Sequence, residues 1–263
     1  MKRAGRADAV RGISSEIRRQ APLVGHTGLM TSSSYEDMDT SDLLALDPEG
    51  DSGRRLLLNP TIFRMLGDVT GRRVLDAGAG QGYLSRLLAH LGAQVTALEP
   101  STRLLGHATV LERERRQGIA LVQKPLHESE FRAEFDYVVC NMVLLDIEDW
   151  RPALDACIVA LRPGGHLVIS LEHPCWSATA GQTWRASRRV EITEYVHEFA
   201  VDRRFGRNYY RPLSHYLNHA LSAGCVLVEL AEPTLPLGSV EREGGDILEH
   251  IPNFVVAHFV RSS

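Results

Sequence analysis

The chain has 263 residues, of which 44% are hydrophobic and 24% charged, a composition typical of a globular protein. No apolar run approaches the length of a membrane span, and the net charge of −4 is unlike that of a dedicated nucleic-acid binder. The four cysteines are widely spaced, with no C-x-x-C pair. We therefore expect reduced thiols in a cytoplasmic protein that does not bind membranes.

Residues 1–30 form a polar segment at the N-terminus. The first 20 residues carry a charge of +4, which leaves −8 for the remainder of the chain. The segment is weakly periodic and lacks the apolar stretch of a secretory signal. We expect a disordered arm. The alternatives are a basic arm that binds an anionic partner and a true start of translation at Met30.

Residues 31–70 are expected to form a helical cap. A helix over residues 41–46 should end at Asp47-Pro48, because the residue before a proline avoids helical geometry. A second helix, over residues 59–67, has Asn59 as a candidate N-cap, Pro60 at the first helical position and Gly67 as a closing glycine. This helix should lead into the first strand.

The most informative stretch covers residues 74–84 and reads Val-Leu-Asp-Ala-Gly-Ala-Gly-Gln-Gly-Tyr-Leu. A buried-strand pattern runs into a glycine-rich turn and then into an amphipathic helix over residues 83–91. Three glycines at alternate positions let the backbone turn tightly and approach a ligand. A second strand, over residues 94–99, ends in Glu99, which can accept both hydroxyls of a ribose. The unit is typical of a nucleotide-binding βα turn.

Two kinds of ligand fit this turn. A dinucleotide site usually has G-x-G-x-x-G, but here the third glycine falls one residue early and Tyr83 takes its place. Asp76, two residues before the first glycine, would repel a pyrophosphate and attract an ammonium group. The run closely resembles the loop of class I S-adenosylmethionine-dependent methyltransferases, whose donor carries such an ammonium group. An NAD-dependent oxidoreductase and a non-catalytic donor-binding protein are the alternatives.

The pattern continues with a charged helix over residues 102–117 and strands over residues 119–123 and 135–141. A further helix leads through Leu161-Arg162-Pro163-Gly164-Gly165 into a fifth strand, over residues 166–171. This helix, turn and strand resemble the same family, and with the first motif the resemblance covers residues 73–173. It implies an α/β fold, a Rossmann-like seven-stranded and mostly parallel sheet with helices on both faces, an N-terminal helical cap and an insertion after strand 5.

The resemblance also implies a donor site at the carboxyl ends of the strands. Asn141 and Met142 should lie over the donor there, and Leu126 should contact the adenine, since the acid that the family usually places nearby is missing. The Asn-Met-Val-Leu run differs from the N-P-P-Y of enzymes that methylate amines of nucleic-acid bases. The expected donor-binding residues are Asp76, Ala77, Gly78, Gly80, Gly82, Tyr83, Glu99, Pro100, Leu126, Asn141, Met142 and Val143.

Residues 174–211 interrupt the pattern with seven arginines, four acids and many aromatic residues. An insertion this long at the end of a strand is usually functional, so we expect a substrate lid. Alternation over residues 190–196 predicts one strand of a small antiparallel cover. Beyond it we expect a closing helix over residues 211–224 and strands over residues 225–230 and 253–260, an antiparallel pair by resemblance. The run Tyr210-Arg211-Pro212-Leu213 also resembles small-molecule methyltransferases of the methyltransferase-11 type.

Few catalytic residues are needed, because methyl transfer is an in-line displacement that depends mainly on orientation. His173, at the end of the fifth strand, is the expected general base; alternatively it orders the His-Pro turn by hydrogen bonding. His215 and Tyr210 are second candidates, since their helix should face the same pocket. His215 and His219 lie four residues apart, but without an acid cluster we expect no metal.

Contacts to the acceptor are assigned to Tyr35, Trp176 and Arg211. By resemblance Tyr35 would be a lid residue, and the alternative is that it packs the cap down. An arginine of the insertion is expected to pair with a carboxylate or phosphate of the acceptor, against the simpler alternative of a solvated loop; the candidates are Arg185, Arg188, Arg189 and Arg211. Pro174-Cys175 is similar to the proline-cysteine of pyrimidine C5 methyltransferases, but its position and apolar setting favour an inert thiol.

The sequence therefore predicts a methyltransferase that uses S-adenosyl-L-methionine and acts on a small molecule, such as an intermediate of natural-product metabolism. The alternative acceptor is a tRNA or another RNA bound by the basic arm, although nucleic acid is disfavoured. We expect a monomer or a homodimer. The predicted organisation is a disordered arm (1–30) and one methyltransferase domain (31–263), divided into a cap (31–70), a donor-binding core (71–173), a substrate lid (174–211) and a closing unit (212–263).

Overall fold

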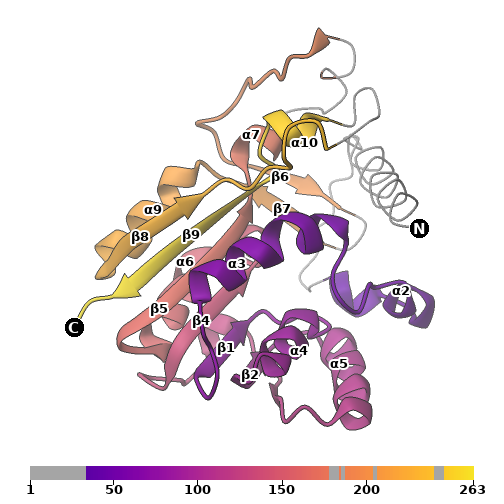
Figure 1. The fold of residues 1–263 in the computed structure, drawn as a ribbon, viewed down its shortest axis with the longest axis vertical. Helices are drawn as coiled ribbons and strands as arrows, with labels where there is room; N and C mark the ends of the chain where they lie inside the picture. Colours follow the sequence, from indigo (N-terminus) through magenta and orange to yellow (C-terminus); the bar gives the residue numbers. More distant parts are fainter. Residues whose placement is uncertain (1–33, 178–183, 185–186, 204–205, 240–245) are drawn as a thin grey trace.

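A seven-stranded sheet forms the centre of the computed structural model, which describes residues 34–177, 184, 187–203, 206–239 and 246–263 (Figure 1). The strand order is β3-β2-β1-β4-β5-β9-β8. The strands are β1 (Arg73–Ala77), β2 (Gln94–Leu98), β3 (Ala120–Val122), β4 (Phe135–Asn141), β5 (Leu161–Glu172), β8 (Cys225–Ala231) and β9 (Phe254–Arg261). Strands β1 to β5 pair in parallel, whereas β9 is antiparallel to both β5 and β8. The predicted fold is thus confirmed; the arm predicted for residues 1–30 lies outside the described residues.

Helices cover both faces of this sheet, with α3 in front of it and α6 behind it in Figure 1. The principal helices are α3 (Asn59–Leu66), α4 (Tyr83–His90), α5 (Thr102–Arg115), α6 (Trp150–Ala160) and α9 (Leu213–Ser222). Shorter elements are η1 (Ser34–Asp37), α2 (Thr40–Leu44), η2 (Arg54–Leu58), η3 (Leu126–Glu128), η4 (Leu144–Asp146), α7 (Pro174–Ser177) and α10 (Ile247–His250). None of the described helices has the length and apolar character needed to cross a membrane.

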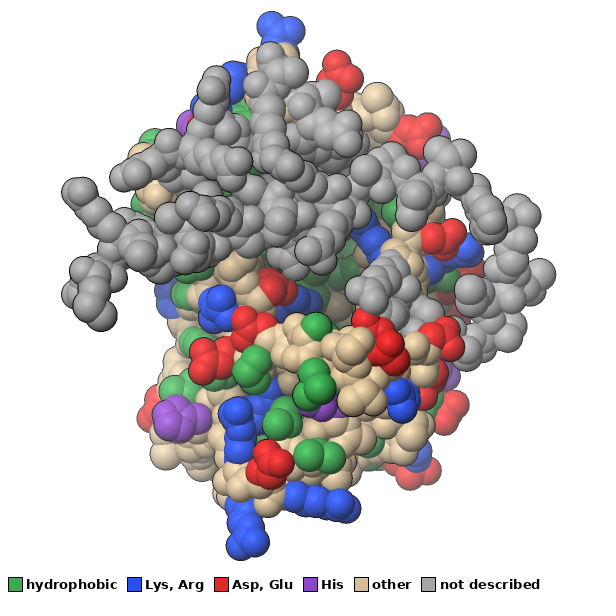
Figure 2. Space-filling model, turned by 90° about the vertical axis from the view of Figure 1, so that its right-hand side faces the viewer, with side chains coloured by type: hydrophobic (Ala, Val, Ile, Leu, Met, Phe, Trp, Pro, Cys, Tyr) green, Lys and Arg blue, Asp and Glu red, His purple; other side chains and the backbone are tan. Residues whose placement is uncertain are grey.

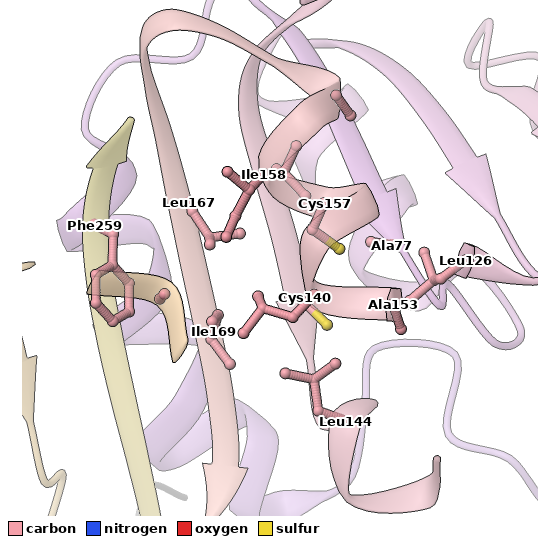
Figure 3. Packing of buried hydrophobic residues seen from close by; sticks show 14 of the residues in the cluster. Ala77, Leu126, Cys140, Leu144, Ala153, Cys157, Ile158, Leu167, Ile169 and Phe259 are labelled. Atoms are coloured by element: carbon pink, nitrogen blue, oxygen red, sulfur yellow. The ribbon is translucent and has the colours of Figure 1, made fainter. Parts of the chain in front are cut away.

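Successive strand residues pack into two different cores. In β5, Leu167 and Ile169 belong to the core under α6 and α9, whereas Val168 between them belongs to the core under α3 and α4. Figure 3 shows Cys157 and Ile158 of α6 directed toward β4 and β5. Because side chains alternate along a strand, a sheet covered on both faces requires a continuous apolar run. This requirement explains why the central strands were readily predicted.

The helix predicted over residues 59–67 begins earlier than expected. The π-helical segment η2 runs directly into α3, and Asn59 has helical dihedral angles (φ −58°, ψ −46°). Asn59 is therefore not an N-cap, and this prediction was wrong. Pro60 lacks an N–H and would crowd a normal preceding turn, whereas a wider π turn gives its ring room within a continuous helix. The closing glycine is confirmed: Gly67 has a φ of 65° and its N–H bonds to the Phe63 carbonyl.

The strand predicted over residues 190–196 is absent from these residues, all of which the structure describes. The small antiparallel cover is instead a hairpin of β6 (Phe199–Asp202) and β7 (Arg207–Tyr210). Val190 packs against the core, but Ile192 and Val196 remain 41% and 71% exposed, so the alternating run does not bury one continuous apolar face. An alternating pattern forms a strand only where its edge also finds a partner.

Replacement of Leu154 by alanine is expected to lower the free energy of unfolding by about 2–5 kcal/mol, because this residue of α6 has a fully buried side chain in the core. The matched change Leu44→Ala removes a side chain that is 74% exposed and should alter that free energy by less than about 0.5 kcal/mol. Urea unfolding of both variants measures the difference. Equal losses would contradict the two-layer core described above.

Candidate active site

The glycine-rich turn lies between β1 and α4, beside the carboxyl ends of β2 and β4. Gly78, Gly80 and Gly82 have positive φ angles of 80°, 57° and 77°, a region that other residues rarely adopt. A Cβ atom on Gly78 would lie 2.5 Å from a Cγ of Val143, in the loop after β4. A Cβ atom on Gly80 would meet nothing within 4 Å. The turn therefore abuts a neighbouring loop at Gly78 and borders open space at Gly80.

Glu99 anchors this turn from the end of β2. Its Oε2 accepts the Gly80 N–H at 2.8 Å, and its Oε1 accepts the Ser101 N–H at 2.9 Å. Burial raises the pKa of the Glu99 carboxyl, while these two hydrogen bonds oppose the rise. The carboxylate thus ties the turn after β1 to the segment after β2, at the place where the sequence predicts the ribose.

Asp76 lies under the turn rather than in it. Its side chain is almost fully buried and accepts a hydrogen bond from the Ser85 hydroxyl of α4 at 2.5 Å. Burial raises the pKa of Asp76 to about 6, and the Ser85 bond limits the rise. Asp76 therefore joins β1 to α4, and its predicted attraction for an ammonium group stays a prediction.

A hydrogen-bonded chain of side chains connects α4, β4 and β5 around the site. Asn141 donates to the Tyr83 hydroxyl at 2.6 Å, and the Ser170 hydroxyl donates to the Asn141 Oδ1 at 2.6 Å. Burial raises the pKa of Tyr83 to about 12. Arg54 of the cap lies 5.9 Å from the centre of the Tyr83 ring. The structure thus brings together two predicted donor residues and covers them with the cap.

The other predicted donor residues occupy different settings. Met142 directly follows β4 with a φ of 60°, held by a hydrogen bond from its N–H to the Ser170 carbonyl. Ala77 is fully buried at the end of β1, Leu126 is buried in the core at the start of η3, and Pro100 is exposed after Glu99.

Asp146, in the loop after β4, links the cap to the hairpin. Its Oδ2 accepts a hydrogen bond from the Tyr35 hydroxyl at 3.0 Å, and its Oδ1 accepts one from the Asn208 side-chain amide. Burial raises the pKa of Asp146 to about 7, and the Tyr35 bond and the Arg54 charge limit the rise. Sequence reasoning missed Asp146. Its position shortly after the end of a central strand was the available signal.

Arg211 is buried, and several of its N–H groups are engaged within the protein. Its Nη2 donates to the carbonyls of Ile147 and Glu148 at 2.9 and 2.7 Å, and its Nη1 donates to the Leu144 carbonyl and the Tyr216 hydroxyl. These bonds fix the backbone on both sides of Asp146. They supply no contact to an acceptor, so the predicted clamp by Arg211 stays a prediction.

Of the other candidate arginines in the insertion, the structure describes Arg188 and Arg189. Arg188 forms an ion pair with Asp246 at 2.5 Å and stacks over Trp184. Arg189 is exposed, and Arg185 lies outside the described residues. Trp176 is buried in the core under α3, although it was assigned to the acceptor.

The predicted general bases also have internal partners. His173 accepts the Cys175 N–H at its Nδ1 and pairs through its Nε2 with Glu232 at 2.7 Å. These bonds match the alternative role, ordering of the His-Pro turn, and the role as base stays a prediction. His215 pairs with Glu198 at 2.6 Å, and the Tyr210 hydroxyl donates to the Tyr195 carbonyl.

Two features set limits on alternative chemistry. Burial raises the pKa of the Cys175 thiol, which disfavours the thiolate needed for nucleophilic attack. Among the described residues, no three His, Cys, Asp or Glu side chains are arranged to hold a metal ion. His219, the neighbour of His215 on α9, instead pairs with Asp155 at 2.7 Å.

A small hollow, open to solvent, lies between the end of β5 and the β6–β7 hairpin. Its lining includes Leu145, Leu171, Glu172, Phe199, Asn208 and Tyr210. Leu145 is the neighbour of Asp146 in the chain, and Asn208 is its hydrogen-bond partner. The hollow therefore lies beside the loop that carries Asp146.

A family model described as a methyltransferase domain matches residues 51–215, which include the glycine-rich turn, the loops after β2 and β4 and the whole insertion. The chain belongs to this family. The ubiquinone biosynthesis O-methyltransferases of Alkalilimnicola ehrlichii and Shewanella halifaxensis are each 33% identical over 130 residues, or 47% of this chain. The alignments cover 53% and 55% of those proteins, so the chain spans about half the length of the curated relatives it matches.

Solved structures support the same fold. An S-adenosylmethionine-dependent methyltransferase from Mesorhizobium loti is 25% identical, with a TM-score of 0.66, over 77% of this chain and 96% of its own. The 1,6-didemethyltoxoflavin-N1-methyltransferase of Burkholderia thailandensis, solved with S-adenosylhomocysteine, covers 92% of this methyltransferase-family chain and 95% of its own. Its TM-score is 0.59 at 17% identity, a likeness of fold alone.

Substitution of Gly78 by alanine is expected to destabilise this family member more than Gly80→Ala. Both changes place a side chain at positive φ, but only the first drives a Cβ into Val143. This overlap is expected to lower the free energy of unfolding by a further ~1–3 kcal/mol. Urea unfolding measures the difference, and Gly78→Ala combined with Val143→Ala should recover part of it. Equal destabilisation by the two single changes would refute the close contact.

Replacement of Arg211 by methionine should lower the free energy of unfolding by about 3 kcal/mol, because it strands the carbonyls of Leu144, Ile147 and Glu148 without a donor. Arg207→Met, which removes an exposed pair with Asp202, should have little effect. Denaturant unfolding compares the two. An Arg211→Met variant of normal stability would contradict this structural role of the hydrogen bonds.

Proposed function

We propose that the chain transfers a methyl group from S-adenosyl-L-methionine to a small-molecule acceptor. The observation that carries this proposal is the turn at Gly78 to Gly82, tied to Glu99, in a chain that belongs to a methyltransferase domain family. The donor, when bound, supplies the methyl group on a sulfonium centre. The M. loti methyltransferase, at 25% identity over most of both chains, supports the same donor.

The residues present fit this donor in two respects. The backbone at Gly80 borders open space, so a ligand can approach it without meeting a side chain. Each Glu99 oxygen accepts one backbone N–H and retains a lone pair that a ribose hydroxyl can use. We propose that Tyr83, Asn141, Met142 and the neighbouring predicted residues complete the donor site, with Asp76 favouring the ammonium group from below.

We propose a hydroxyl as the acceptor group. The curated relatives are named as O-methyltransferases of ubiquinone biosynthesis, and these matches span about half of their length. On the face shown in Figure 2, acidic and basic side chains of the described residues are interspersed rather than gathered in a basic surface. That distribution supports a small molecule over RNA. The four free thiols, three of them buried, support a cytoplasmic location.

Calorimetry is expected to give binding of S-adenosylmethionine and S-adenosylhomocysteine and no binding of NAD. Glu99→Gln should weaken donor binding at least about tenfold, because an amide cannot accept both backbone N–H groups. Glu114→Gln, on the exposed face of α5, is the matched control. Binding of NAD without binding of the donor would overturn the proposal, and mass spectrometry of acceptors after incubation with the donor tests turnover itself.

A further inference from the structure

Three of the carboxylates near the carboxyl ends of the central strands, Asp76, Glu99 and Asp146, have different kinds of partner. Asp76 is almost fully buried and accepts a hydrogen bond from Ser85 of α4. Glu99 accepts the backbone N–H groups of Gly80 and Ser101. Asp146 is partly exposed and accepts its hydrogen bonds from two side chains. Those side chains, Tyr35 and Asn208, belong to the elements that cover the site. Asp146 is thus the carboxylate of the three that meets the covering elements.

The backbone around Asp146 is held in place. Arg211 bonds to the carbonyls of Leu144, Ile147 and Glu148, on both sides of the acid. The carboxylate is then oriented by one hydrogen bond on each oxygen, from Tyr35 and from Asn208. A reactive group needs this kind of support, because small errors of position lower reaction rates steeply. The arrangement therefore suits a carboxylate that acts on a ligand.

Four groups from different elements face Asp146: Tyr35 of η1, Arg54 of η2, Glu99 after β2 and the neutral Asn208 of β7. Burial raises the pKa of Asp146 to about 7 and Glu99 adds to the rise, while Tyr35, Arg54 and Asn208 oppose it. A carboxylate with this pKa is partly ionised at neutral pH and can both take and release a proton there.

We propose that Asp146 is the proton acceptor for a hydroxyl-bearing ligand in the hollow beside it, with Tyr35 and Asn208 as positioning residues. This inference rests on the proposed function. In the step, the acceptor oxygen forms its bond to the methyl carbon and releases its proton to an Asp146 oxygen. The carbon–sulfur bond breaks, and its electron pair stays on sulfur as a neutral thioether. The proton then passes from the Asp146 acid to solvent.

The same geometry indicates the kind of hydroxyl. A base with a pKa near 7 can assist ionisation of a hydroxyl on an aromatic ring, whose pKa is about 10 as in tyrosine, far better than that of an aliphatic alcohol. The hollow is lined in part by Phe199 and Tyr210, whose rings stack at 4.4 Å between centres. Aromatic walls favour a flat aromatic ligand. A small phenol, with catechol as the test probe, is the acceptor that these features select.

Asp146→Asn keeps the shape of the side chain and removes its basicity. With catechol at about pH 8, this variant should lose about 10²-fold in kcat, since general base catalysis typically contributes at least that factor. Its affinity for S-adenosylmethionine, measured by calorimetry, should stay within about twofold of the parent protein. Glu148→Gln removes an exposed carboxylate from the same loop and is the matched control, expected to retain full activity.

The pH dependence separates a base from a structural acid. In the parent protein, kcat should fall tenfold per pH unit below about 7, because protonated Asp146 cannot accept a proton. Tyr35→Phe removes a bond that favours the ionised carboxylate, so the acidic limb should move to higher pH. Asp146→Asn should lack the limb. If Asp146 acted in packing alone, its replacement would lower activity without changing the pH of the acidic limb. The shift in Tyr35→Phe tests the proposal even if Asp146→Asn folds poorly.

An Asp146→Asn variant with the parent kcat and pH profile would overturn the inference. The inference would also be overturned if the parent protein binds the donor and methylates aniline but neither phenol nor catechol. It would likewise be overturned if the parent protein binds the donor and methylates none of these three compounds. Those results leave donor binding in place, and methylation of aniline would keep the proposed methyl transfer to a small molecule while ruling out the hydroxyl acceptor. A parent protein that does not bind S-adenosylmethionine overturns both.

Discussion

The contact between Gly78 and Val143 is the constraint on which the site depends. The absence of a side chain at Gly78 lets the loop after β1 touch the loop after β4, with no room for a further carbon atom. With the two loops at this separation, Asn141 at the end of β4 reaches Tyr83 at the start of α4. This hydrogen bond therefore accompanies a steric fit between two adjacent strands of a parallel sheet.

Most charged groups that looked functional in the sequence are used to shape loops. Arg211 satisfies three carbonyls, His173 orders the turn after β5, and Arg188 pairs with Asp246. A buried loop carries peptide groups that need partners, and long side chains from elsewhere in the chain can supply them. Asp146 differs because its partners are side chains of covering elements.

The sequence alone predicted the central sheet and the glycine-rich turn, but not the details of the cap and of the loop that carries Asp146. Strands such as β4 matched their predicted limits because burial on both faces leaves an unbroken apolar run, and the turn was marked by glycines that the positive φ angles require. The π turn before Pro60 has no comparable signature. Asp146 was missed because its setting comes from residues 111 and 62 positions away, Tyr35 and Asn208, which only tertiary packing brings to it.

The first part of the cap, residues 35–49, is attached to the rest of the molecule mainly through polar contacts. From residue 35 to residue 49, Met38 is the one fully buried side chain, and the attachment includes bonds from the Tyr35 hydroxyl to Asp146 and from the Thr102 N–H to Glu36. Lifting such a segment exposes little apolar surface, and water can replace the bonds that are lost. Residues 35–49 are thus the part of the cap whose local detachment costs least, while α3 and the sheet beneath stay folded.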